Sequence, residues 1–154
     1  MSASLVVASQ RWLPFVGGAE NILSDLRLTM LTPAMPQDRR IVVITITEDT
    51  LSRFTYRSPI DRAFLAELIT ALDASGAAAI GIDILFDQAT EPEKDTALAA
   101  ALSAAETPIV AIRADTRDGL TGRQVDYLDR ATAAIETGFA RLPRDAYDGI
   151  VRNY

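Results

Sequence analysis

The chain has 154 residues, of which 49% are hydrophobic, and a formal net charge of -6. That length and apolar content suffice for one globular domain, whereas the acidic balance argues against a nucleic-acid partner, which needs clustered Lys and Arg. Because the sequence contains no His and no Cys, it offers no Ser-His-Asp or Cys-His catalytic group and no Cys or His metal site.

Nothing in the sequence marks a membrane span. No segment has the roughly 18 consecutive apolar residues that crossing a bilayer requires. The first segment, MSASLVVASQRW, also lacks the basic region and the long apolar core of a signal peptide. A soluble domain cut from a larger receptor would look the same, so the compartment needs another argument.

The first predicted elements are a helix, a linker and a strand. Residues 19–31 place apolar side chains at helical intervals, and the two prolines of PAMPQD cannot continue a helix. Residues 41–47, IVVITIT, are β-branched throughout and bounded by charged residues, which is typical of a strand buried on both faces. We expect this segment to be the first strand of a sheet.

A helix and a second strand are predicted next. Ser58 suits an N-cap and Pro59 the first helical position, so a helix should run to about Ala74, with Gly76 as its left-handed C-terminal residue. Residues 77–86, AAAIGIDILF, follow as a strand. A right-handed crossover through the helix would make the two strands parallel.

The second half of the chain repeats this pattern. The predicted elements are a helix at 95–106, a strand at 109–114, a loop at 115–123, a helix at 127–135, and two hairpin strands at 138–143 and 149–154. Together the elements predict an α/β fold, with a mainly parallel central sheet flanked by helices and a C-terminal hairpin.

Two aspartates interrupt the apolar strand in the segment GIDILFD. Strand alternation puts Asp83 on a face that we expect helices to cover, near the carboxyl end of the strand, with Asp87 beyond it. Glu48 and Asp49 end the neighbouring predicted strand at the same edge, where open α/β sheets bind their ligands. Three or four carboxylates are therefore expected to converge.

Two arginines are candidates for the same region. Arg62 lies in the first turn of its predicted helix, on the side that meets the strand ends, where it could pair with Asp83 or Asp49. It could equally hold a carboxylate or phosphate group of a ligand. Arg152 presents the same two possibilities, and the sequence does not decide between them.

The acidic edge itself has two interpretations. Asp83 could be a structural latch that accepts hydrogen bonds from nearby backbone or from Arg62, or the carboxylates could form a pocket for Mg²⁺, Ca²⁺ or a cationic ligand. Neither GxGxxG nor GxxxxGK[ST] occurs, so nucleotide binding has no motif. We expect no catalytic residues and no cofactor. The alternatives are a metal-dependent hydrolase that uses these carboxylates and a structural interaction domain.

Several segments occur in the order that is usual in the CHASE2 family of extracytoplasmic sensor domains, which bacterial adenylate cyclases, diguanylate cyclases, histidine kinases and protein kinases contain. These segments are DLRLTML, IVVITITEDTL, SPIDR, GAAAIGIDILFD, DTALAAAL, PIVAI and TGFARLPRDAYDGIVR. The chain resembles this family over residues 20–154. The family usually has an aspartate where this chain has Thr47, so a carboxylate there would come from Glu48 or Asp49.

The resemblance implies a location and a domain organisation. Residues 19–154 would form a sensor domain on the extracytoplasmic, periplasmic side of the cell membrane, incomplete at its C-terminus. Residues 1–18 would hold the end of a membrane span, and further spans would flank the domain outside this chain. Receptors of this kind commonly act as dimers, so we expect a homodimer with a contact through the N-terminal helix.

The resemblance also implies a sensory mechanism. A small molecule or another environmental signal would bind one arrangement of the domain better than another and bias the attached helices by population shift. We expect this signal to act in a crevice lined by Asp83, Arg62, Asp49 and Asp87.

Overall fold

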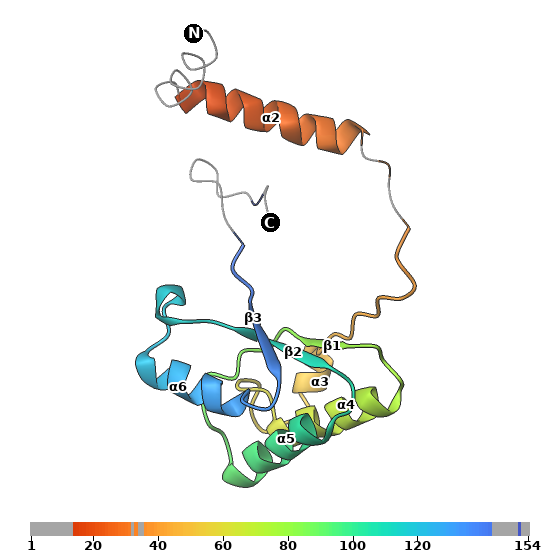
Figure 1. Ribbon diagram of the computed structural model, residues 1–154, viewed down its shortest axis with the longest axis vertical. Coiled ribbons are helices and arrows are strands. Elements are labelled where there is room, and N and C mark those ends of the chain that lie inside the picture. Colours follow the sequence, from red (N-terminus) through yellow and green to blue (C-terminus); the bar gives the residue numbers. More distant parts are fainter. Residues whose placement is uncertain (1–13, 32, 34–35, 143–150, 152–154) are drawn as a thin grey trace. The chain divides into compact units, whose positions relative to one another are not determined.

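The computed structural model describes residues 14–31, 33, 36–142 and 151 of the chain. Residues 45–142 form one compact unit, and the remainder of the chain falls in a second. Each unit is therefore described by itself (Figure 1). The predicted boundary at residue 18 lies inside a helix of the second unit and stays a prediction.

The second unit contains helix α2, Pro14–Leu31, which confirms the predicted N-terminal helix and extends it toward the N-terminus. Ile22, Leu26 and Met30 follow one another at four-residue spacing, and their side chains are exposed. Within the described residues, no helix is both long enough and apolar enough to cross a bilayer.

The predicted strand at residues 41–47 is wrong. These residues are coil, and Ile41, Val42, Val43 and Ile44 are all more than half exposed. Their β-branched side chains favour an extended backbone, but a strand also needs a neighbour that pairs with its N–H and C=O groups. No ladder in the described residues includes this segment, so composition alone does not make it a strand.

A parallel sheet of three short strands organises the unit at residues 45–142. Its strands are β1, Ile80–Ile82, then β2, Ile109–Arg113, and β3, Glu136–Phe139, in the order β1-β2-β3. Gly81 is opposite Val110, and Ile112 is opposite Gly138, in two parallel ladders. The strands predicted at 77–86 and 109–114 are thus confirmed in place, although the first is shorter.

Three helices cover one face of this sheet, as Figure 1 shows. They are α4, Arg62–Ala74, α5, Pro92–Ala104, and α6, Gly122–Ala131. The short helices α3, Glu48–Leu51, and η1, Thr116–Asp118, lie in the connecting segments. The predicted fold class, an α/β domain with a mainly parallel sheet flanked by helices, is confirmed.

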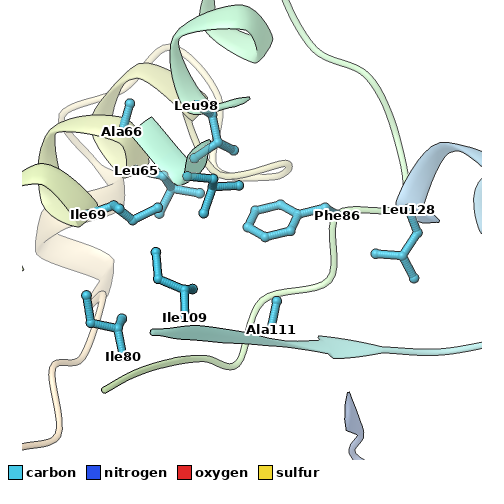
Figure 2. Close-up of a cluster of buried hydrophobic side chains, with 10 residues drawn as sticks. Leu65, Ala66, Ile69, Ile80, Phe86, Leu98, Ile109, Ala111 and Leu128 are labelled. Atoms are coloured by element: carbon cyan, nitrogen blue, oxygen red, sulfur yellow. The ribbon is translucent and has the colours of Figure 1, made fainter. Parts of the chain in front are cut away.

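The hydrophobic core fills the space between the sheet and these helices (Figure 2). Its most deeply buried side chains come from every layer of the unit: Leu65, Ile69, Ile80, Phe86, Leu98, Leu102, Ile109, Ala111 and Leu128. Phe86 lies between Leu98 of α5 and Leu128 of α6, although it belongs to neither a strand nor a helix. Burial of this apolar surface is the main force that holds the helices to the sheet.

Helix α4 begins later than predicted. Asp61, not Ser58, is its N-cap, because the Asp61 Oδ1 accepts hydrogen bonds from the backbone N–H groups of Ala63 and Phe64, at 3.0 and 3.1 Å. The Ser58-Pro59 peptide bond is cis. The predicted end at Ala74 is confirmed, and Gly76 has the positive φ, 74°, that the end of a helix often requires.

The C-terminal part differs from the prediction in two respects. Helix α6 begins at Gly122, within the predicted loop, because Thr121 and Gln124 cap it reciprocally through side chain and backbone. Strand β3 begins two residues before the predicted one and runs parallel to β2, and it has no hairpin partner in the described residues. The predicted second hairpin strand, 149–154, lies outside the described residues except for Val151.

Candidate functional site

The most deeply buried charged group of the described residues is the guanidinium of Arg62. The Asp61 cap starts α4 at this residue, and only 1% of the Arg62 surface is exposed. The guanidinium carbon lies 4.9 Å from the centre of the Phe86 ring, within the range of a cation–π interaction. Because the Phe86 ring belongs to the core, Arg62 is held at the edge of the core by packing as well as by charge.

The polar contacts of Arg62 are few for a buried cation. Its Nη2 donates a long hydrogen bond of 3.5 Å to the carbonyl of Gln88, and its Nε is 3.9 Å from Asp95 Oδ1. Its Nη1 is buried with no hydrogen-bond partner in the described part of the chain. Burial lowers the pKa of Arg62, and the negative charge of Asp95 opposes that shift.

Asp95 belongs to the first turn of α5 and is fixed from the preceding loop. Its carboxylate accepts hydrogen bonds from the Thr90 backbone N–H, at 2.9 Å, and from the Thr90 hydroxyl, at 2.7 Å. Thr90 thereby closes the turn before α5 and orients the carboxylate that faces Arg62. The first turns of α4 and α5 are thus joined through a single guanidinium.

A second network joins the same two helix ends. The Lys94 Nζ donates to Asp61 Oδ2 at 2.6 Å and to Glu91 Oε1 at 3.0 Å, and the Tyr56 hydroxyl donates to Glu91 Oε2 at 2.6 Å. Burial works to raise the pKa of Asp61, but the hydrogen bonds from Lys94 and the α4 backbone outweigh it, so this pKa is lowered. These contacts raise the pKa of Lys94.

We expect Asp61→Ala to lower the free energy of unfolding by about 1–2 kcal/mol. The change removes the α4 cap and leaves Lys94 without one of its two carboxylates. Asp61→Asn keeps an oxygen that can cap and is expected to cost less. Urea unfolding of the two variants measures the difference, and equal losses would contradict a capping role.

Hydrogen bonds from Tyr56 and Lys94 lower the pKa of Glu91 from 4.5 to about 2. Because the folded-state pKa is below the unfolded value, the contribution of Glu91 to stability is present above about pH 4.5 and is lost as the pH falls toward about 2. Glu91→Gln should therefore flatten the acid limb of a plot of unfolding free energy against pH. An unchanged acid limb would refute this assignment.

Asp87 has a structural contact with α6. Its Oδ2 accepts a hydrogen bond of 2.7 Å from Gln124 Nε2, while Gln124 Oε1 accepts from the Thr121 backbone N–H at 3.0 Å. Asp87 also acts electrostatically on Arg62. Of the predicted crevice residues, Asp87 and Arg62 are therefore the two that the structure places in the same neighbourhood.

The predicted position of Asp83 is wrong. Ile80 is buried and Ile82 half-buried, whereas Gly81 and Asp83 are exposed. The alternation is as expected, but α4, α5 and α6 lie on a single face of the sheet. Asp83 alternates with Ile80 and Ile82 and is exposed, so it belongs to the opposite face. Arg62 consequently pairs with Asp95 in place of Asp83.

The remaining predicted site residues do not join this neighbourhood. Asp49 is exposed on α3, and Glu48 forms an exposed ion pair with Arg57 at 2.8 Å. Arg152 lies outside the described residues. Among the described residues, no group of three or more acidic side chains is arranged to hold a metal ion. A ligand role for each of these residues stays a prediction.

We expect Asp83→Asn to change the free energy of unfolding by less than about 0.5 kcal/mol, because substitutions of exposed side chains rarely cost more. Thermal unfolding of the variant checks this. A loss of about 2 kcal/mol or more would show instead that Asp83 is a buried latch.

Sequence reasoning missed the residues that complete the surroundings of Arg62. A cavity of about 250 Å³ lies beside this side chain, and its lining includes Asp95, Leu98, Tyr127 and Arg130. The burial of Tyr127, followed by the charge of Asp95, raises the pKa of its hydroxyl. The signal that the sequence offered was the position of Asp95 in the first turn of the next long helix, α5, which matches the position of Arg62 in the first turn of α4.

Comparison with known proteins gives one match. The family model described as the CHASE2 domain matches residues 2–154. Searches of curated proteins and of solved structures find no significant match. CHASE2 domains are extracytoplasmic sensory domains found in signalling proteins. Since the match spans essentially the whole chain, the chain belongs to the CHASE2 family.

Proposed function

We propose that this domain is the sensory part of a bacterial transmembrane receptor whose output is an adenylate or diguanylate cyclase, a histidine kinase or a protein kinase. The observation that carries the proposal is the CHASE2 match over residues 2–154. The geometry supports it, because the first turns of α4 and α5 meet at an incompletely paired cation beside a cavity. A ligand there would lie against residues of α4, α5 and α6.

Such a site suits signalling by population shift. The Nε of Arg62 is 3.9 Å from the Asp95 carboxylate, which is a loose contact compared with the 2.6 Å between Lys94 and Asp61. A ligand that binds more strongly to one arrangement of this contact biases the relative positions of α4 and α5. The bias cannot exceed the difference in affinity between the two arrangements.

The experiment that tests this proposal uses the full-length receptor in its own membrane. Protease added to spheroplasts should cleave within the domain, while the output domain is protected until the cells are opened. Protection of the sensory domain in intact spheroplasts would refute the proposed location. A receptor whose cyclase or kinase activity is unaffected by deleting residues 45–142 would refute the sensory role.

We further propose that the receptor is a homodimer with a contact through α2. The supporting observation is the exposed apolar stripe formed by Ile22, Leu26 and Met30. Sedimentation of the 154-residue chain should give a dimer, and Leu26→Asp should give a monomer. Leu102→Ala, in the core of the other unit, serves as the control that weakens folding without touching this stripe. A monomer in the unaltered chain would refute the contact.

A further inference from the structure

The cavity beside Arg62 has properties that indicate the chemistry of its ligand. Its walls come from α5, from α6 and from the Arg62 side chain at the start of α4. The volume of about 250 Å³ is slightly below the range of about 300–1,000 Å³ that is usual for ligand pockets, so it suits a small metabolite.

The charges in the lining favour an anion. The lining includes two arginines, Arg62 and Arg130, and one acidic residue, Asp95. Asp95 already accepts two hydrogen bonds from Thr90, which leaves it less free to hold a cationic ligand. Asp87 also acts on Arg62, but it is not part of the lining and is bonded to Gln124.

One donor in this site lacks a partner. The Nη1 of Arg62 has no hydrogen bond in the described part of the chain, although Arg62 is 99% buried, as its exposed fraction of 1% shows. A buried donor without an acceptor costs free energy. A ligand oxygen that accepted a hydrogen bond from Nη1 would remove this cost, which favours binding. Because Nη1 exposes almost no surface, such an oxygen reaches it only if the Arg62 side chain moves.

Most of the rest of the lining is apolar or aromatic. The exception is Thr96, whose hydroxyl donates a hydrogen bond of 2.7 Å to the Pro92 carbonyl. Leu98, Ala99 and Ala131 contribute aliphatic surface, and the ring of Tyr127 borders the cavity. Phosphate and sulfate have no apolar part that would use this surface. A carboxylate with a short hydrocarbon tail uses both the arginines and the aliphatic wall.

We propose that this cavity binds a small organic carboxylate, with its charged end between Arg62 and Arg130 and its hydrocarbon part against Leu98, Ala99 and Ala131. This inference rests on the proposed sensory function and names the ligand class of that site. The bound carboxylate supplies the acceptor that Arg62 lacks and joins the first turn of α4 to α6. A ligand of this kind links the helices in the way that a population shift requires.

The test is a titration of the ¹⁵N-labelled 154-residue chain with sodium butyrate, at an ionic strength held constant with sodium chloride. We expect saturable shifts of the amide signals of Ala99, Arg130 and Ala131, and a rise in melting temperature with butyrate concentration. Butylammonium chloride has the same tail and the opposite charge, so it should produce neither effect. Inorganic phosphate should bind at least about tenfold more weakly, because it lacks the tail.

Arg130→Gln provides the decisive variant, because Arg130 is exposed and its loss should leave the fold intact. Butyrate should bind this variant at least about fivefold more weakly. Arg123→Gln, on the same helix and outside the lining, should bind like the unaltered chain. The inference would be overturned if butyrate changed the amide signals and the melting temperature no more than sodium chloride does. It would also be overturned if Arg130→Gln bound butyrate as tightly as the unaltered chain.

The two proposals can fail separately. If butyrate binds at Arg130 but never changes the output of the full-length receptor, the carboxylate site stands and the sensory role of this site fails. If the receptor passes the protease and deletion tests while butyrate does not bind, the location and sensory role stand and the ligand class is overturned.

Discussion

Phe86→Ala should lower the free energy of unfolding by about 3–5 kcal/mol, as large-to-small substitutions of buried aromatics do. The Phe86 ring is 1% exposed and lies among the buried leucines of α5 and α6 (Figure 2). It also supports the Arg62 guanidinium at 4.9 Å. The substitution therefore creates a cavity in the core and removes the aromatic ring that contacts the buried Arg62 guanidinium.

Urea unfolding of Phe86→Ala measures this loss, with Phe139→Ala as the matched control. Phe139 is 50% exposed and lies against Arg113 and Arg141 at 5.2 and 5.3 Å, so it also has cation–π partners. Because its ring is only half buried, its removal should cost about 1 kcal/mol. Comparable losses in the two variants would contradict the central position of Phe86 in the core.

The helices and two of the strands could be predicted because their signals are local. Helix α4 buries Leu65 and Ile69, four residues apart on one face, and the segment at 109–113, rich in Ile and Val, is β2. The start of α4 was misplaced because Ser58-Pro59 has N-terminal chemistry of its own, while Asp61 forms the actual cap. Two competing caps three residues apart cannot be separated without the backbone geometry.

The non-local features could not be predicted from the sequence. Whether residues 41–47 form a strand depends on a partner, and the sheet at residues 45–142 pairs β1 with β2 alone. The face that Asp83 occupies follows from alternation, but which face the helices cover does not. Arg62 lies in the first turn of its helix as predicted, yet its partner is Asp95, on the next long helix. Partner choice depends on how two helices dock, which no local pattern encodes.

The two networks at the ends of α4 and α5 differ in strength. In the first network, Lys94 donates hydrogen bonds to both Asp61 and Glu91, and these bonds are short, at 2.6 and 3.0 Å. The contact between Arg62 and Asp95 is 3.9 Å long, and Nη1 of Arg62 has no hydrogen-bond partner among the residues that the structure describes. The first network therefore holds the helix ends together, and the second is the one that a ligand can rearrange.

Arg62→Ala should lower the free energy of unfolding by about 3 kcal/mol or more, because it removes buried volume and leaves Asp95 without its cation. The loss should be close to about 3 kcal/mol, because Asp95 keeps two hydrogen bonds from Thr90 and its side chain is 21% exposed.

Arg62→Met separates packing from charge. Methionine retains an unbranched apolar stem that can contact the Phe86 ring, and it removes the guanidinium with its unpaired Nη1. Replacing an incompletely paired buried charge by an apolar side chain of similar length is often neutral, so the methionine variant should lose less than half of what the alanine variant loses. Equal losses of unfolding free energy in Arg62→Met and Arg62→Ala, measured by urea unfolding, would mean that the charge of Arg62 stabilises the fold and that its apolar stem does not. In that case Arg62 would already be satisfied by Asp95 and Gln88, and it would have no need of an external acceptor.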